Sequence, residues 1–136
     1  MLKEYVRWIG LDLAFQEIDE ELAGLPGDYA PPRGTLGLAL VDGEPAGCVA
    51  LRPLDARRGE FKRLFVRPAF RGHGAGRALM EWIMAEARRI GYVEMVADTL
   101  PQMAEALAMY ERAGFERTGP YADAPTPDAI YLRYIL

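Results

Sequence analysis

Apolar residues recur along the chain with two different spacings, and the changes of spacing divide predicted helices from predicted strands. Over residues 13–25, large apolar side chains stand three or four positions apart with acidic residues between them, which predicts an amphipathic helix. A similar pattern over residues 5–9 predicts a helical segment before it. Prolines and glycines between residues 25 and 34 stop helix formation, and leucines then alternate as in a strand over residues 36–40.

The middle of the chain predicts an antiparallel meander of three strands. Asp42-Gly43 lies between two strand-like segments and is a strong hairpin signal. The second strand ends near Leu51, and the third is predicted from Glu60 to Val66.

Helical spacing returns after the third strand. Apolar residues from Leu79 to Ile90 predict a helix that ends at Gly91, and a short strand is predicted over residues 93–97. Residues 99–102 have the Thr-x-x-Gln form of a capping box, which predicts the start of a second helix ending at Gly114. Strands near Phe115 and over residues 130–136 complete an α/β (α+β) pattern in which one mixed sheet is flanked by helices.

Composition limits the classes of protein to consider. The 136 residues suit one domain, predicted over 1–136. The formal net charge of −4 argues against a nucleic-acid partner and leaves a cationic one as the easier fit. Cys48 is the single cysteine, so no disulfide can form within the chain, and the sequence has no apolar run long enough to span a membrane. We expect a cytoplasmic protein without a membrane partner; a homodimer is left open.

The segment from Arg71 to Arg77 carries the strongest chemical signal. Three of its residues are glycines at the start of a predicted helix, where glycine costs ~1 kcal/mol against alanine. Such glycines expose backbone N–H groups, which together with the flanking arginines can bind a phosphate or pyrophosphate. The alternative is a flexible loop that only joins two elements.

Two other phosphate-binding loops fit this segment less well. A P-loop ends in Gly-Lys-Ser or Gly-Lys-Thr, and the chain contains neither Lys-Ser nor Lys-Thr. A dinucleotide fingerprint fits Gly72 and Gly74 but has Arg77 where its third glycine belongs, and too little chain follows for the strand and helix repeats of that fold.

The sequence resembles the GNAT superfamily of acetyltransferases, whose pyrophosphate loop reads Arg/Gln-x-x-Gly-x-Gly/Ala. Arg71, Gly74 and Gly76 match that pattern. The preceding strand, residues 60–68, and the later helix with its ending, residues 106–115, match in the same order. The resemblance extends from Thr35 to Leu136 and implies a mostly antiparallel central sheet with splayed parallel strands.

The resemblance also implies the cofactor and its contacts. Acetyl-CoA would be the co-substrate, with its pantetheine arm along the β-strand backbone, its pyrophosphate on the glycine loop and its thioester end beside the later helix. Many family members have an asparagine after the strand that precedes that helix. This chain has Thr99-Leu100-Pro101 there, so one polar cofactor contact of the family is not matched. The implied cofactor-binding residues are Leu64, Phe65, Val66, Arg71, Gly72, His73, Gly74, Ala75, Gly76, Arg77, Met103 and Leu107.

Two residues are candidates for the chemistry of acetyl transfer to an amine. An alkyl amine of pKa ~10 is almost fully protonated at pH 7, so a carboxylate that accepts its proton would help. Glu60, at the start of the strand that meets the cofactor, is the proposed base; the alternative is an exposed glutamate paired with Lys62. Tyr110 matches the family's proton donor to the leaving thiolate, and the alternative is a tyrosine that only packs in the core.

The remaining reactive residues suggest no other chemistry. His73 is read as a loop residue, because a single histidine with no adjacent nucleophile makes no catalytic triad. Cys48 is expected to pack in a strand, and no cluster of metal ligands is present in the sequence, so no metal is expected. Tyr121, Asp123 and Tyr131 are candidates for the acceptor side.

Two functions from different classes follow from the sequence. The first is an N-acyltransferase that moves an acetyl group from acetyl-CoA to a small-molecule or peptide amine by direct attack in a ternary complex. The second is a non-catalytic module that binds acetyl-CoA for sensing or assembly. The glycine loop is compatible with both, and the sequence does not identify the acceptor.

Overall fold

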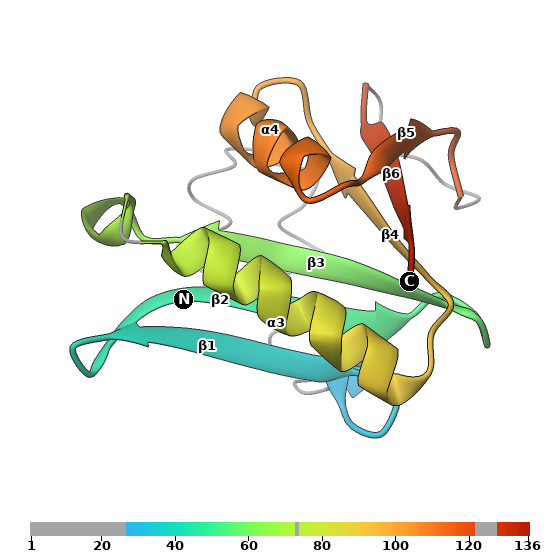
Figure 1. Ribbon diagram of the computed structural model, residues 1–136, viewed down its shortest axis with the longest axis horizontal. Helices are drawn as coiled ribbons and strands as arrows, with labels where there is room; N and C mark the ends of the chain where they lie inside the picture. The colour runs from blue at the N-terminus through green and yellow to red at the C-terminus, as the bar shows by residue number, and fades with distance from the viewer. Residues whose placement is uncertain (1–26, 73, 122–127) are drawn as a thin grey trace.

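The computed structural model describes residues 27–72, 74–121 and 128–136. Six strands form one sheet in the order β1-β2-β3-β4-β6-β5, and two helices of the described chain lie against it (Figure 1). The elements are η1 (Gly27–Tyr29), β1 (Thr35–Val41), β2 (Glu44–Pro53), β3 (Arg58–Val66), η2 (Pro68–Phe70), α3 (Ala75–Ile90), β4 (Glu94–Thr99), α4 (Ala104–Arg112), β5 (Glu116–Thr118) and β6 (Ile130–Ile135).

The sheet is mixed and mostly antiparallel, as predicted. β1, β2 and β3 form an antiparallel meander, β6 runs antiparallel to both β4 and β5, and β3 and β4 are the parallel pair. The predicted hairpin is confirmed: Asp42 and Gly43 connect β1 to β2 with φ values of 51° and 81°, the positive angles that a two-residue turn of this type requires.

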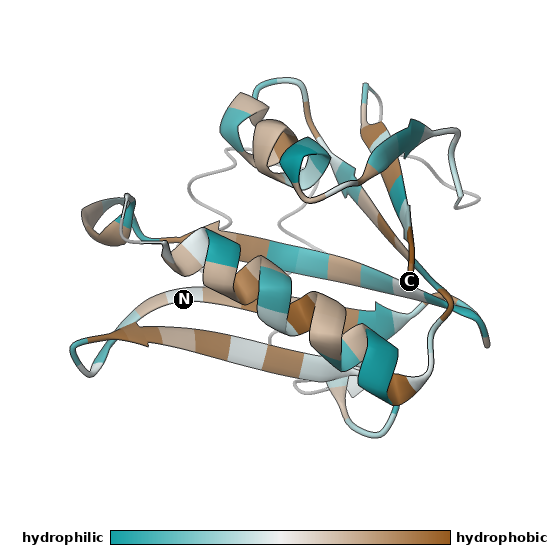
Figure 2. Cartoon of the chain, viewed as in Figure 1, coloured by the Kyte–Doolittle hydropathy of each residue, from teal (hydrophilic) through white to brown (hydrophobic). Residues whose placement is uncertain are grey.

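α3 covers one face of β1, β2 and β3. Its apolar residues pack on the sheet, so apolar and polar residues follow one another along the helix at helical spacing (Figure 2). Gly91 ends the helix with φ 105°, and its N–H group donates to Ala87 and Arg88 carbonyl oxygens. The predicted helix from Leu79 to Ile90, with its glycine cap, is therefore confirmed, and it begins one turn earlier, at Ala75.

β3 and β4 form a fork, the feature that positions the site. They pair through only three positions, of which Glu60 with Val96 is the last, and beyond that pair they diverge (Figure 1). The register between β2 and β3 shifts between Cys48 and Ala50, where Arg63 has φ 60°. Such a bulge bends a strand, so it accounts for the departure of β3 from β4.

The start of α4 differs from the sequence prediction. Thr99 is the last residue of β4 and caps no helix; its hydroxyl is buried without a hydrogen-bond partner in the described residues. α4 begins at Ala104, after Met103 at the N-cap, with no side-chain cap. The capping-box prediction was wrong because the strand continues to Thr99. The two helices predicted within residues 5–25 lie outside the described residues.

Candidate active site

The loop between η2 and α3 holds two glycines in backbone conformations that other residues rarely adopt. Gly72 has φ 85° and Gly74, the N-cap residue of α3, has φ 78°. The described residues provide no side-chain cap at this end of the helix, and its first turn has no acidic residue. The N–H groups of the first turn therefore have no partners within the helix, and the positive end of the helix dipole favours an anion beside them.

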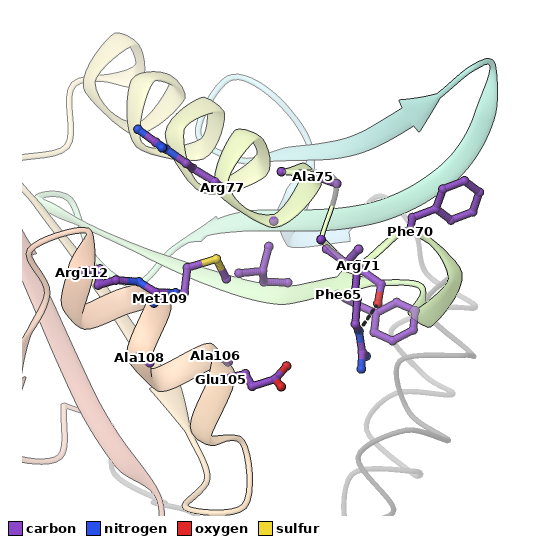
Figure 3. A pocket seen from close by; sticks show the side chains of 15 residues that line it. Phe65, Phe70, Arg71, Ala75, Arg77, Glu105, Ala106, Ala108, Met109 and Arg112 are labelled. Atoms are coloured by element: carbon purple, nitrogen blue, oxygen red, sulfur yellow. Dashed lines mark hydrogen bonds between the residues drawn. The ribbon is translucent and has the colours of Figure 1, made fainter.

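A pocket of about 460 Å³ lies between this loop, the end of β3 and α4 (Figure 3). Gly76 lets the wall from α3 approach closely, because a Cβ atom there would lie 3.3 Å from Met109 Sδ and 3.5 Å from Val66 Cγ2. The lining residues are Leu64, Phe65, Val66, Phe70, Arg71, Gly72, Gly74, Ala75, Gly76, Arg77, Glu105, Ala106, Ala108, Met109 and Arg112.

Three arginines surround the pocket. Arg71 donates from Nε to the Val66 carbonyl oxygen at 3.2 Å, which ties the loop to the end of β3 (Figure 3). Arg77 forms an exposed ion pair with Glu81 one turn along α3. Arg112, in the last turn of α4, forms no ion pair within the described chain. The pocket therefore combines apolar strand and helix walls with cations and backbone donors, as a ligand with an apolar arm and anionic groups requires.

A group of polar and charged residues lies on the other face of the sheet. Phe61 and Leu64 of β3 and Met95 and Ala97 of β4 belong to the core beneath the helices. Because successive strand residues point to opposite faces, their neighbours point away from α3 and α4. Glu60 and Lys62 of β3 and Asp98 of β4 are among these neighbours. Together with Arg52 of β2 and Tyr121, which both donate a hydrogen bond to Glu60, they form a charged cluster.

Glu60 is the fixed centre of the charged cluster. It is only 4% exposed, and each of its carboxylate oxygens accepts one hydrogen bond. Arg52 Nε donates to Oε1 at 2.9 Å and the Tyr121 hydroxyl donates to Oε2 at 2.6 Å. A carboxylate oxygen can accept two bonds, so each oxygen keeps capacity for another donor. The alternative of an exposed glutamate paired with Lys62 is wrong: Glu60 is buried, and its ion pair is with Arg52.

Burial shifts the pKa values of two other groups of the charged cluster. Burial lowers the pKa of the Lys62 ammonium, an effect that the nearby carboxylates of Glu60 and Asp98 partly oppose. Burial also raises the pKa of the Tyr121 hydroxyl well above its ordinary range, and Asp98 and Glu60 add to that rise. Tyr121 therefore stays protonated and acts as a hydrogen-bond donor to Glu60. Its ring packs edge-on against Tyr131, with centroids 5.4 Å apart.

Tyr110 lies across the sheet from Glu60. It is 4% exposed on α4, and its ring meets the ring of Phe61 edge-on at 5.1 Å between centroids. Phe61 follows Glu60 directly in β3 and points to the helix face. Tyr110 and Glu60 therefore flank the point where the fork begins, one from each face.

The pocket brings together most of the cofactor-binding residues predicted from the sequence. Those from Leu64 to Val66 and from Arg71 to Arg77 line it, apart from His73, which lies outside the described residues, as does Asp123. Met103 and Leu107 do not line it; they pack beside it, Met103 buried and Leu107 partly buried against the core. Phe70 and the α4 residues Glu105, Ala106, Ala108, Met109 and Arg112 line the pocket but were not predicted to bind the cofactor.

The helical spacing of α4 contains the signal for its pocket-lining residues. Residues 105, 109 and 112 stand four and three positions apart, so they form one stripe of the helix. The sequence prediction used the neighbouring apolar stripe through residues 103, 107 and 110. That stripe faces the core, and the mixed stripe beside it faces the pocket.

Other ligand types find little support in the described residues. Cys48 is buried in β2 and its thiol donates to the Arg63 carbonyl oxygen at 3.2 Å, next to the bulge, so it has the packing role predicted. Across the described ranges, no group of three or more His, Cys, Asp or Glu side chains could hold a metal ion. Within the same ranges, no helix combines the length and apolar character that crossing a membrane requires.

Comparison with known proteins finds similar sequences. The profile of the Acetyltransferase (GNAT) family matches residues 4–115. An uncharacterized N-acetyltransferase of Schizosaccharomyces pombe is 38% identical over 135 residues, which cover 98% of this chain and 83% of that protein.

Two solved structures show the same fold. An acetyltransferase from Streptococcus agalactiae superposes with a TM-score of 0.78 at 24% identity, covering 99% of this chain and 91% of that one. A GNAT family acetyltransferase from Elizabethkingia anophelis, solved with acetyl-CoA bound, has a TM-score of 0.70 at 24% identity, covering 92% and 85% of the two chains.

Proposed function

From the premise that the chain belongs to the GNAT family of acetyltransferases and is an acetyl-CoA-dependent acyltransferase, we propose that it transfers the acetyl group to an amine by direct attack. Acetyl-CoA and the amine would be bound together, each on its own side of the fork between β3 and β4. The observation that carries this proposal is the pocket, which joins uncapped backbone donors at the start of α3 to the end of β3.

The residues around the pocket fit acetyl-CoA. The uncapped N–H groups of α3, with Arg71 and Arg77, would hold the pyrophosphate. The backbone from Leu64 to Val66, where β3 has left β4, would hold the pantetheine arm. Gly76 supports this fit, because a side chain there would reach into the space beside Met109 and Val66.

When bound, acetyl-CoA supplies an activated thioester. The chain must then accept a proton from the amine and donate a proton to the departing thiolate. Glu60 lies where the fork begins, and each of its oxygens can accept one more hydrogen bond, so it would take the proton of the amine directly or through water. Tyr110, on the opposite face of the same point, would donate its proton to the departing thiolate. Arg52 and Tyr121 would keep the Glu60 carboxylate oriented.

The test is release of free thiol from acetyl-CoA in the presence of a panel of amines. Thiol release that depends on an amine supports the transferase. Acetyl-CoA that raises the melting temperature without thiol release for any amine would instead support a binding module. At ~100 times its dissociation constant, a ligand stabilises the fold by ~2.7 kcal/mol, which such a melting experiment detects.

A further inference from the structure

Lys62 and Asp98 occupy matching places on the two arms of the fork. Glu60 and Val96 are the last paired residues of β3 and β4. Lys62 stands two residues beyond Glu60, and Asp98 stands two residues beyond Val96. Because residues two apart in a strand share a face, both side chains belong to the face of Glu60. One arm of the fork therefore carries a cation and the other an anion.

These two opposite charges do not pair with each other. Asp98 lies close enough to Lys62 to affect its pKa, yet no ion pair joins them. Within the part of the chain that the structure describes, neither side chain makes a hydrogen bond or an ion pair, although both are partly buried. A partly buried charge normally has a partner. The strands no longer pair at these positions, and no described side chain forms a hydrogen bond or ion pair that bridges the two opposite charges.

The neighbouring side chains surround the region between Lys62 and Asp98. Glu60 closes it where the fork begins and is held by Arg52 and Tyr121. Tyr121 packs on Tyr131, which is paired with Asp98 across β4 and β6. Two carboxylates, Glu60 and Asp98, and the Lys62 ammonium thus lie around one region of this face, close enough for both carboxylates to act on Lys62.

We propose that the acceptor is an amine that also carries a carboxylate, in the manner of a free amino acid. Its amino group lies between Glu60 and Asp98, and its carboxylate lies against Lys62. This assignment rests on the proposed function and deepens it, because it gives the chemical class of the acceptor. Bound in this way, one small zwitterion compensates both unpaired charges at once.

The reaction balances with the acceptor carboxylate unchanged. A bond forms between the acceptor nitrogen and the acetyl carbonyl carbon, and the bond from that carbon to sulfur breaks. The acceptor nitrogen enters as an ammonium and loses two protons in all through Glu60 to water, one before the attack and one as the amide forms. The thiolate gains one proton from Tyr110, which regains a proton from water, so the reaction releases one proton overall. The products are an N-acetyl amino acid and coenzyme A. Lys62 is a specificity residue here, since it binds the part of the acceptor that does not react.

Matched acceptors test the proposal on the full chain. Free amino acids are compared with the carboxamides of the same amino acids, which keep the reacting amine and lose the negative charge. We expect kcat/KM at least about tenfold higher for the acids, because the carboxamide leaves the Lys62 charge without a counter-charge. Lys62→Met should remove this preference, mainly by raising KM for the acids, and Lys62→Arg should restore much of it.

Arg133→Met is the matched control. Arg133 is an exposed cation of the same sheet, on β6, and its loss should leave the preference unchanged. Equal or better rates with the carboxamides in the unaltered chain would overturn the proposal, as would equal losses for both acceptor types in Lys62→Met. Either result still shows amine-dependent thiol release. Failure of the proposed function is different, because then no amine releases thiol.

Discussion

The pocket and the charged cluster lie on opposite faces of the same fork, and they are built in different ways. The pocket takes much of its wall from one stretch of sequence, residues 64–77, and offers mainly backbone groups and apolar side chains. The charged cluster takes side chains from β2, β3, β4 and the segment after β5; Glu60 and Tyr121, which share a hydrogen bond, are 61 residues apart along the chain. A ligand shared by many related proteins can be bound by a local backbone motif, whereas selection of an individual acceptor depends on side chains that only the fold brings together.

Glu60→Gln should have the largest effect and separates the two faces most clearly. The amide keeps the size of the side chain and can still accept from Arg52, but it cannot take a proton from the amine. We expect turnover to fall by about 10²- to 10⁴-fold, while acetyl-CoA still raises the melting temperature as before. Turnover is measured by thiol release and binding by thermal shift.

Tyr121→Phe is the control for Glu60→Gln, because it removes one bond to the carboxylate and leaves the carboxylate itself. Its effect on turnover should be much smaller. If Glu60→Gln retains full turnover per folded molecule, Glu60 is no base and serves the structure of the charged cluster alone.

Tyr110→Phe tests the proton donor on the helix face. The change keeps the ring that packs on Phe61 and removes only the hydroxyl. If Tyr110 protonates the thiolate, turnover should fall by roughly ten- to a thousandfold with little change in acetyl-CoA affinity or melting temperature. A core tyrosine predicts the reverse, a loss of about 1 kcal/mol in stability with turnover retained. Both quantities are measured on the same variant.

Gly76→Leu should weaken the pocket without disturbing the charged cluster. The new side chain points toward Met109 and Val66, where it takes space from the pantetheine arm, and leucine is a better helix residue than glycine. We expect about a hundredfold weaker acetyl-CoA binding, or ~2.7 kcal/mol, with a stable fold. Gly74 is a poorer choice, because its φ of 78° makes any larger residue strained whatever the ligand does.

Ala78→Leu is the matched control for Gly76→Leu. Ala78 is exposed on the same helix and does not line the pocket, so acetyl-CoA binding should be retained. Equal binding by both variants would place the cofactor elsewhere.

Local patterns predicted the fold and the pocket well. The hairpin at Asp42-Gly43, the helix ending at Gly91 and the glycine loop each depend on neighbouring residues, and all three are present as predicted. The capping-box prediction failed because β4 pairs with β6 as far as Thr99. This tertiary pairing overrode the local helix-start signal.

The charged cluster could be predicted only in part. The sequence makes Glu60 a candidate base, but its hydrogen bonds to Arg52 and Tyr121 depend on the antiparallel register and on a segment far along the chain. The opposition of Lys62 and Asp98 depends on where β3 and β4 separate, which no periodicity of either strand reveals. In the sequence, Lys62 is one of two basic residues in the strand predicted from Glu60 to Val66, and Asp98 follows the strand predicted over residues 93–97.

Lys62→Met should give the smallest effect, a change in stability that depends on pH. Burial lowers the pKa of Lys62 in the folded chain, so its charge costs stability whenever the lysine is protonated in both states. As pH rises through the lowered pKa, the folded chain releases this proton while the unfolded chain keeps it up to pH ~10.4. The unfolded state then binds more protons, so the cost of Lys62 shrinks with rising pH.

We therefore expect Lys62→Met, without any acceptor, to melt higher than the unaltered chain at pH 7, by up to about 4 °C. This difference should shrink toward pH ~10, where the lysine is increasingly neutral in the folded chain. Arg133→Met, which removes an exposed cation, should show a difference that hardly varies over the same range. A lower melting temperature for Lys62→Met at pH 7 would mean that the ammonium already stabilises the fold through Glu60 and Asp98. The charged cluster would then be a completed ion network with no charge left for an acceptor to compensate.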